Sequence, residues 1–199
     1  MVYSPRLRKA IGHLNAALAD AGFGLQDARF ARHGEHEPNA DAPLIMVACS
    51  GGRDSMALLS LLSQMPGCHL IACHVNHGLR PEAEEEAQFV CRYAACLGVP
   101  CVQERADVRG MARSRGISIE EAARDARQAL FLKWAAGYPG AFVALAHHRN
   151  DQQETALLHL CRGASGIHGM SPVSTWANGL TVVRPPVSYT HLTLPTNSL

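Results

Sequence analysis

Apolar residues along this chain fall into two kinds of pattern, and their order predicts the fold. Short apolar runs at residues 43–49, 69–75, 99–104 and 141–146 favour buried strands. Between these runs, apolar residues recur at intervals of three and four, which is typical of amphipathic helices. Strands that alternate with helices pair in parallel through right-handed crossovers. We therefore expect an α/β domain of the Rossmann-like kind, with an open parallel sheet and helices on both faces.

Helix ends are marked by residues with known positional preferences. Pro81 suits the first turn of a helix and Gly98 suits its end, so a helix is expected between them. Ser118 and Glu121 form a capping box at the start of another helix. The buried stripe of that helix is expected at Ile119, Ala123, Ala126 and Leu130. Further helices are expected at residues 5–21, 56–62 and 151–161.

Arginines follow the third predicted strand at a regular spacing. Arg105, Arg109 and Arg113 recur every four residues, with Arg115 close by, and on a helix the first three would share one face. Such a stripe either contacts RNA phosphates or is the solvated face of a helix. We favour the solvated face, because charge runs usually have that role.

Composition narrows the class of protein. With 199 residues, 47% of them hydrophobic and 18% charged, the chain is expected to be globular and to have one full core. The net charge of +1 argues neither for nor against a nucleic-acid partner. No apolar stretch is long enough to span a bilayer, so no membrane partner is expected. Oligomeric state does not follow from composition.

Cysteine usage gives a further expectation. Seven cysteines are present, an odd number, and no C-x-x-C pair occurs. Neither a disulfide framework nor a zinc knuckle is therefore predicted. Most of the cysteines lie in apolar runs, where a free thiol packs as a small hydrophobic group. This usage fits the reducing cytoplasm, where we expect the protein to be located.

Candidate chemistry is concentrated in the sequence SGGRDS, on the turn between the first strand and its helix. Gly51 and Gly52 allow backbone angles that other residues avoid and a close approach by a ligand. Backbone N–H groups and the positive end of the helix dipole favour an anion there, and Ser50 and Ser55 add hydroxyl donors. Asp54 would repel a phosphate unless a cation stood between them. It therefore predicts either Mg²⁺ at the turn or an acid that takes part in the reaction.

The turn does not match the GxxxxGK(S/T) pattern of P-loop kinases and GTPases. It resembles the SGGxDS motif of the PP-loop family, ATP pyrophosphatases that split ATP into AMP and pyrophosphate. The alternative is a plain Gly-Gly turn without a ligand, which the strand before it and the helix after it make less favoured.

Further segments resemble the tRNA(Ile)-lysidine synthetase family of PP-loop enzymes, over about residues 43–186. They are VACSGGRDSMALL, HVNHGLRPEA from His74, GISIEEAARDAR from Gly116, ALAHHRNDQQETALLHLCRGASGIHGM from Ala144 and VVRPPV from Val182. Two positions depart from the family pattern. Asn150 stands where the family usually has a first aspartate before Asp151, and Gln128 stands where it commonly has tyrosine. An amide binds Mg²⁺ more weakly than a carboxylate, so only Asp151 carries over as an acid.

The resemblance implies a two-step reaction. ATP adenylates the wobble cytidine of an isoleucine tRNA with a CAU anticodon, and free L-lysine then attacks the adjacent ring carbon. AMP leaves and lysidine is formed, with pyrophosphate as the other product. The implied cofactors are ATP and Mg²⁺, and the implied partners are the tRNA and lysine.

The resemblance also implies roles for individual residues. The ATP-binding set is expected to be Ser50, Gly51, Gly52, Arg53, Asp54, Ser55 and His74. The catalytic residues are expected to be Asp54 and Asp151, and Asp54 is also the expected magnesium ligand. The residues expected to contact the nucleotide or the tRNA are Arg124, Arg127, His147 and His148. Each of these residues also has a purely structural explanation. Asp151 can be the N-cap of a helix, the two arginines can be solvated, and the two histidines can have a structural role at a strand end.

The chain is expected to divide into three parts. Residues 1–42 would be a helical extension and polar linker, and residues 43–186 the PP-loop catalytic domain. Residues 187–199 contain no Lys, Arg, Asp or Glu, show no helical period and match nothing in the family. We expect this tail to be foreign sequence that packs poorly, and the chain to be an incomplete enzyme that binds ATP but forms little lysidine.

Two other functions remain open at this point. One is a different PP-loop enzyme, such as a tRNA thiolase, although those usually carry a C-x-x-C pair or iron–sulfur ligands. The other is a nucleotide-binding module without catalysis. Lysine-dependent release of AMP on tRNA would separate the ligase from both, whereas the fold alone would not.

Overall fold

The computed structural model describes residues 9, 12, 14–16, 18–19, 43–65, 68–146, 171, 173–176 and 179–185. The strands are β1 (Leu44–Ala48), β2 (His69–Asn76), β3 (Cys101–Arg105), β4 (Phe142–Leu145), β5 (Val173–Thr175) and β6 (Thr181–Val183). The helices with assigned bounds are α2 (Arg53–Leu62), α3 (Ala83–Cys96), α4 (Val108–Arg115) and α5 (Ile119–Ala135). The predicted helix at 151–161 and the tail at 187–199 lie outside the described residues.

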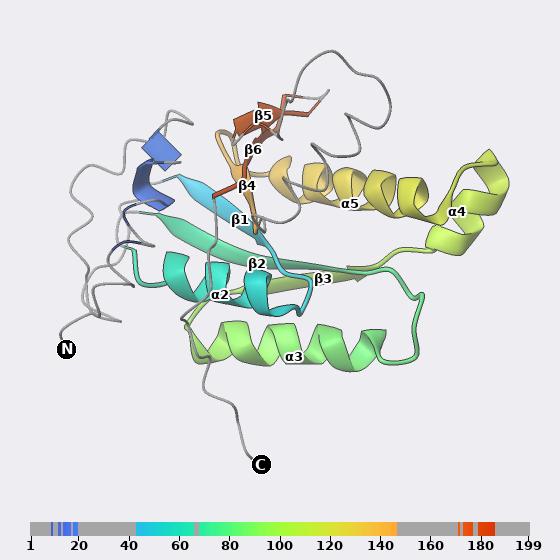
Figure 1. Ribbon diagram of the computed structural model, residues 1–199, viewed down its shortest axis with the longest axis horizontal. Coiled ribbons are helices and arrows are strands. Elements are labelled where there is room, and N and C mark those ends of the chain that lie inside the picture. The colour runs from blue at the N-terminus through green and yellow to red at the C-terminus, as the bar shows by residue number, and fades with distance from the viewer. Residues whose placement is uncertain are drawn as a thin grey trace.

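The described strands form one sheet in the order β3-β2-β1-β4-β6-β5. β1 pairs in parallel with β2 on one side and with β4 on the other, and the β2–β3 and β4–β6 pairs are also parallel. Helices α2 and α3 cover one face of the sheet and α5 covers the other (Figure 1). The predicted α/β class with an open, mostly parallel sheet is therefore confirmed.

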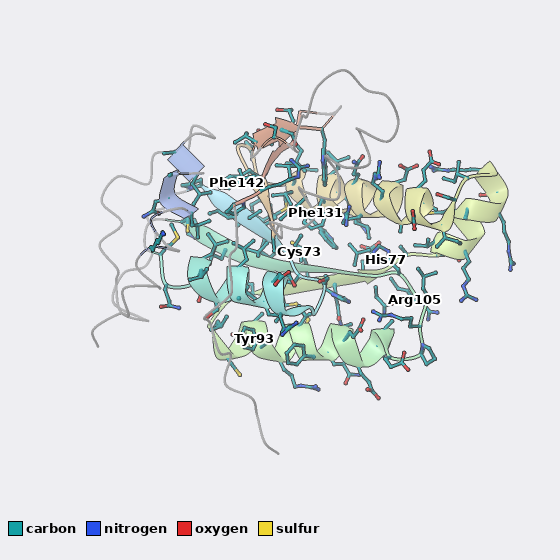
Figure 2. All side chains as sticks on the ribbon, in the orientation of Figure 1. Cys73, His77, Tyr93, Arg105, Phe131 and Phe142 are labelled. Atoms are coloured by element: carbon teal, nitrogen blue, oxygen red, sulfur yellow. A yellow bond between two sulfur atoms is a disulfide. The ribbon has the colours of Figure 1, made fainter. Side chains whose placement is uncertain are left out.

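Strand β1 is apolar without interruption because helices cover both of its faces. Ile45, Met46 and Val47 are each at most 1% exposed. Ile45 and Val47 pack with α2 and α3, whereas Met46 packs with Phe131 of α5 on the other face. Figure 2 labels Phe131, which lies on the α5 side of the sheet. Because both faces of β1 are buried, it lacks the alternation of apolar and polar residues that is typical of a strand with one exposed face. It also holds the end of β1, where the SGGRDS turn begins, in a fixed position.

The N-terminal segment contributes to the core through two leucines. Leu14 and Leu18 are 2% and 0% exposed and belong to the apolar cluster on the α2 face. The described residues of this segment are helical, as their four-residue spacing predicts. None of the helices in the described part of the chain is both long enough and apolar enough to cross a membrane.

Two helix predictions are corrected by the structure. Arg105 is the last residue of β3, because Asp107 starts a new helix by accepting a hydrogen bond from Gly110 N at 2.9 Å. Arg105 therefore shares no helix with Arg109. On α5, Ile119 is 41% exposed, and the buried positions are Ala122, Ala126 and Phe131. Ala122 and Ala126 are buried because α4 packs on the first turns of α5, and Phe131 is buried because the sheet packs on the later turns.

The short strands at the sheet edge and one disulfide were not predicted. β5 and β6 have three residues each, too few to show a period, and β5 runs antiparallel to β6. Cys91 of α3 is joined to Cys101 of β3, with 5.4 Å between their Cα atoms. The pair forms because α3 packs beside β3, a proximity that an odd number of cysteines neither predicts nor excludes.

The capping box at α5 gives a small, testable stability effect. Ser118 Oγ accepts a hydrogen bond from Glu121 N at 3.1 Å. Ser118→Ala should lower the free energy of unfolding by about 1 kcal/mol and Tm by about 2–4 °C. Ser114→Ala is the matched control, because Ser114 only donates to Met111 O near the end of α4. Equal melting temperatures for the two variants would contradict the capping role.

Candidate active site

The turn after β1 is shaped by one glycine and one serine. Gly51 has φ of +85°, a left-handed conformation that favours glycine. Ser55 is 5% exposed, and its Oγ accepts from Ser50 N at 3.1 Å and donates to Gly52 O at 3.0 Å. Ser50 Oγ accepts in turn from Gly52 N at 3.3 Å. In this structure the Ser55 hydroxyl therefore holds the turn together, in addition to any contact it makes with a ligand.

Helix α2 starts directly from this turn and has no side-chain cap. It begins at Arg53, three residues before the predicted start, because Gly52 is the N-cap residue with extended backbone angles. Gly52 O accepts the first helical hydrogen bond, from Met56 N at 3.1 Å. A helix N-terminus without a side-chain cap favours an anion, through its N–H groups and its dipole. The first turn also carries Asp54, the single acid at this end of the helix.

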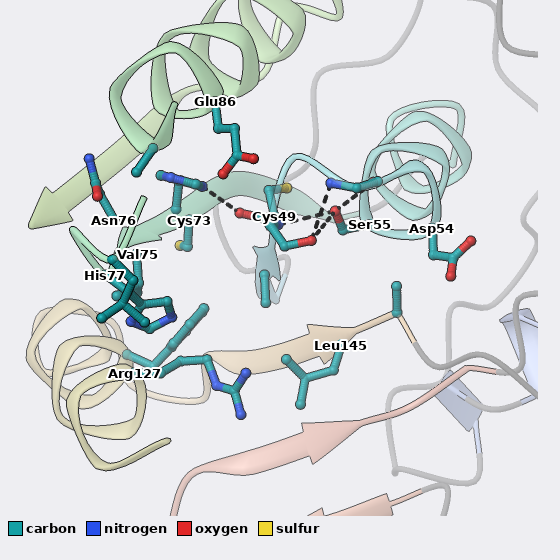
Figure 3. A pocket seen from close by; sticks show the side chains of 18 of the residues that line it. Cys49, Asp54, Ser55, Cys73, Val75, Asn76, His77, Glu86, Arg127 and Leu145 are labelled. Carbon is teal, nitrogen blue, oxygen red and sulfur yellow. Dashed lines mark hydrogen bonds between the residues drawn. The ribbon is translucent and has the colours of Figure 1, made fainter. Parts of the chain in front are cut away.

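A cavity of about 520 Å³ opens beside the turn. It lies at the carboxyl ends of β1, β2 and β4, where the chain passes from one half of the sheet to the other (Figure 3). Open α/β sheets bind their ligands at this position. The lining residues that carry a charge or a titratable ring are Arg53, Asp54, His74, His77, Arg80, Glu86 and Arg127.

His74 anchors β2 to the turn. It is 4% exposed, and its Nδ1 lies 2.8 Å from Cys49 O. A carbonyl oxygen can only accept, so Nδ1 carries the proton and the other ring nitrogen is left to accept or to be protonated. His74 lines the cavity, as expected for a residue at the carboxyl end of a strand. Its role toward adenosine stays a prediction.

The loop between β2 and α3 forms another wall and is held by several polar contacts. Asn76 Oδ1 accepts from Gly78 N at 2.9 Å, and Arg109 Nη2 donates to Leu79 O at 3.2 Å. Arg80 donates to both carboxylate oxygens of Glu86, at 2.9 and 3.0 Å. This pair is partly exposed, so it contributes more to the shape of the cavity mouth than to stability.

Positive charge collects on the wall between that loop and α5. Burial, with Arg127 and His74 nearby, lowers the pKa of His77. Burial also lowers the pKa of the Arg127 guanidinium, with a smaller effect from Arg124. Burial and the charge of Arg127 lower the pKa of Arg184, which follows β6. Of these arginines, Arg127 lines the cavity and supplies positive charge to this wall.

Two buried thiols lie at the cavity floor. Burial raises the pKa of Cys49 to about 12, and it also raises the pKa of Cys73 on the neighbouring strand. A thiol reacts as a nucleophile in its thiolate form, so neither group is reactive near neutral pH. Their function here is packing, as the sequence predicts for cysteines in apolar runs.

The structure brings most of the predicted nucleotide-binding residues together. The cavity is lined by Ser50, Gly52, Arg53, Asp54, Ser55, His74 and Arg127. Gly51 belongs to the same turn, whereas Arg124 is exposed and is absent from the lining. His147, His148, Asn150 and Asp151 lie outside the described residues. Among those described, no three His, Cys, Asp or Glu side chains gather as a metal site, and the magnesium role of Asp54 stays a prediction.

Several lining residues were not selected from the sequence. They are Asn76, His77, Arg80, Glu86 and Phe131. The signal for the first two was present, because they lie at the carboxyl end of a buried strand, the sheet edge where ligands bind. Glu86 comes from the first turn of α3 and Phe131 from the later part of α5, and only the packing of these helices brings them to the cavity.

Comparison with protein families identifies the domain. The family model described as the PP-loop domain matches residues 27–196. The chain belongs to the PP-loop family. The SGGRDS turn and the residues that line the cavity fall within the matched range, and the turn is called the PP loop below.

Curated relatives of this PP-loop chain are tRNA(Ile)-lysidine synthases. The one from Bifidobacterium longum subsp. infantis is 39% identical over 197 residues, which cover 96% of this chain and 50% of the relative. The one from Bacillus subtilis is 35% identical over 161 residues, which cover 78% of this chain and 34% of the relative. The chain thus spans at most about half the length of these relatives.

Solved structures support the fold at low sequence identity. The U34-tRNA thiolase NcsA from Methanococcus maripaludis, with its 4Fe-4S cluster, has a TM-score of 0.62 at 13% identity, covering 90% of this chain and 58% of its own. An NH3-dependent NAD synthetase from Campylobacter jejuni has a TM-score of 0.50 at 12% identity, covering 85% of this chain and 63% of its own. At these identities the likeness concerns the fold alone.

Proposed function

We propose that this PP-loop domain uses ATP to adenylate the wobble cytidine of an isoleucine tRNA with a CAU anticodon. Free L-lysine then displaces AMP from the adenylated ring carbon, which gives lysidine, and pyrophosphate is released in the first step. The proposal rests on one observation above all. A cavity large enough for a nucleotide lies beside a turn with a left-handed glycine and the uncapped start of a helix. The chain that carries it is 39% identical to a tRNA(Ile)-lysidine synthase.

The chemical requirement of the proposed reaction is a good leaving group. The carbonyl oxygen on the cytosine ring leaves poorly, and its conversion to an ester with AMP lets it depart as part of AMP when the lysine amine attacks the ring carbon. The PP loop would take the terminal phosphates of ATP, because its amide groups and the start of α2 favour an anion. Gly51 supports this by giving the backbone a conformation that other residues rarely adopt.

Asp54 would act at the charged end of ATP. Two acids line the cavity, and of these Asp54 lies in the first turn of α2, directly beside the PP loop. A carboxylate oxygen fits Mg²⁺, and bound Mg²⁺ would neutralise negative charge on the phosphates. Asp54 would then hold that ion against the PP loop. Asp151, outside the described residues, remains the second acid of the proposal.

The sulfur-transfer alternative is less favoured. A tRNA thiolase needs a reactive cysteine or iron–sulfur ligands beside the nucleotide. Of the cysteines lining the cavity, Cys49 and Cys73 are buried thiols with raised pKa values. The remaining alternative, a module that binds ATP without catalysis, differs from the proposal only in turnover and is separated by the following test.

The direct test is the joining of labelled lysine to tRNA. The chain is incubated with ATP, Mg²⁺, radiolabelled lysine and isoleucine tRNA bearing a CAU anticodon, and an isoleucine tRNA with a GAU anticodon is the control. We expect label on the CAU tRNA alone, in low yield because the chain spans at most about half the length of its relatives, with AMP and pyrophosphate formed in equal amounts. Formation of ADP, or equal labelling of both tRNAs, would contradict the proposal.

A further inference from the structure

The β2–α3 loop, residues 77–82, is supported from behind by elements that do not reach the cavity. The residues of this loop that line the cavity are His77, Gly78, Leu79 and Arg80. The end of β3 and helix α4 lie behind the loop, and neither of these two described elements contributes a lining residue. The shape of this cavity wall therefore depends on side chains that a ligand in the cavity does not touch.

Helix α4 holds the loop at Leu79. The Leu79 side chain packs against the apolar cluster between α4 and α5, whose buried members are Val108, Ala112, Ala122 and Ala126. Its carbonyl oxygen accepts a hydrogen bond at 3.2 Å from Nη2 of Arg109, in the first turn of α4. A hydrogen bond from a charged donor is stronger than one between neutral groups. Leu79 is therefore fixed through both its side chain and its backbone.

The last residue of β3 lies against the loop at Gly78. Arg105 is in register with Asn76, two residues before Gly78, and Ala106 N donates to Asn76 O at 2.8 Å. Gly78 has φ of +61°, and a Cβ there would lie 3.2 Å from Arg105 Nε and 3.4 Å from Arg105 Nη2. The guanidinium of Arg105 therefore occupies the space beside the Gly78 backbone that a larger side chain would need.

Neither arginine takes part in an ion pair with another described residue. The ion pairs in the described part of the chain are Arg80–Glu86, Arg115–Asp125 and Lys133–Glu104. Arg105 and Arg109 are both exposed, so burial does not force their side chains onto the loop. Two exposed cations from different elements thus converge on consecutive residues of one loop, Gly78 and Leu79.

We propose that Arg105 and Arg109 are positioning residues, which hold the β2–α3 loop in the conformation that forms the nucleotide cavity. This inference rests on the proposed function, in which the cavity binds ATP. Apparent affinity falls with the fraction of molecules in the binding conformation, so a loop that samples other conformations binds its ligand more weakly. Loss of either arginine should therefore weaken ATP binding, although neither side chain lines the cavity.

Titration calorimetry with ATP tests the two arginines. Arg105→Met and Arg109→Met keep an apolar stem and remove the guanidinium. We expect each variant to weaken ATP binding roughly threefold, and the two changes together to weaken it roughly tenfold. Arg109→Lys should restore most of the affinity, because an ammonium group can also donate to the Leu79 carbonyl. Arg113→Met is the matched control on α4, because Arg113 is exposed and lies one turn beyond Arg109, and it should bind ATP as the parent does.

Amide hydrogen exchange shows whether the change in affinity arises in the loop. Gly78 N donates to Asn76 Oδ1 at 2.9 Å, which protects this amide while the loop is in place. Arg105→Met and Arg109→Met should each speed exchange at Gly78 roughly threefold and leave exchange in α2 at the parent rate. A general loss of stability would instead speed exchange in both regions.

Two results would overturn the inference. One is parent-like ATP affinity in a folded variant that carries both Arg105→Met and Arg109→Met. The other is weaker ATP binding while exchange at Gly78 stays at the parent rate. Thermal melting reports folding, and the single variants decide the matter if the double variant does not fold. A parent chain that fails to bind ATP would contradict the proposed function and this inference together, whereas parent-like binding by the variants contradicts this inference alone.

Discussion

Asp54→Asn should abolish ATP-dependent chemistry and leave the fold intact. Asp54 is an acid in the first turn of α2, inside a turn that otherwise favours anions. Asparagine has the same size but carries no charge and binds Mg²⁺ weakly. If Asp54 holds the metal ion, its loss removes charge stabilisation in the transition state, and the rate should fall roughly 10³-fold. The rate is measured as tRNA-dependent release of pyrophosphate from ATP.

The control for this variant is an acid of the same type away from the cavity. Asp125 on α5 pairs with Arg115 at 3.2 Å, and both side chains are exposed. Asp125→Asn should keep the parent rate, because an exposed pair contributes about 1 kcal/mol or less to stability. Melting temperatures of both variants should stay within a few degrees of the parent. Parent-like pyrophosphate release from Asp54→Asn would show that the assigned role is wrong.

Gly51→Ala should disable nucleotide binding through backbone strain alone. A Cβ at this position would lie 3.7 Å from Glu86 Cβ and 3.8 Å from Val90 Cγ2, which are ordinary contacts. The cost therefore comes from φ of +85°, about 1–2 kcal/mol for an L-residue. Relief of the strain rotates the peptide groups of the PP loop away from the phosphates. We expect ATP affinity to fall roughly 30-fold, about 2 kcal/mol.

A substitution at Gly98 is the control that distinguishes a general effect of backbone strain on stability from an effect on ATP binding. Gly98, after α3, has φ of +69°, and a Cβ added there would meet no atom within 4 Å. Gly98→Ala should cost the same stability of about 1–2 kcal/mol and leave ATP affinity unchanged. ATP affinity measured by calorimetry decides the matter. If both variants lose stability equally and both keep ATP affinity, the geometry of Gly51 is not needed for binding.

The central strands and the PP loop could be predicted from sequence because local signals define them. β1 and β2 are apolar runs buried on both faces, so their predicted bounds differ from the structure by about one residue. The SGGRDS turn was predictable because a strand pattern precedes it and a helix pattern follows it. Capping at Ser118 was also predictable, because the hydrogen bond joins residues three apart.

Features made by distant contacts could not be predicted in this way. Glu86 reaches the cavity from the first turn of α3 and Arg127 from the middle of α5, on opposite faces of the sheet. The repeat that begins at Arg105 suggested one helix, but Asp107 starts α4 after the strand has ended. The Cys91–Cys101 bond depends on how α3 packs beside β3. In each case the missing information is tertiary packing, which no local pattern encodes.

The most direct test of the proposed nucleotide site is a crystal structure of the chain with an ATP analogue that has a methylene bridge between its first two phosphates. We expect the terminal phosphates within hydrogen-bond distance of the backbone amides of residues 51–55. A nucleotide bound outside the cavity, or one whose phosphates do not contact the PP loop, would contradict the proposed site.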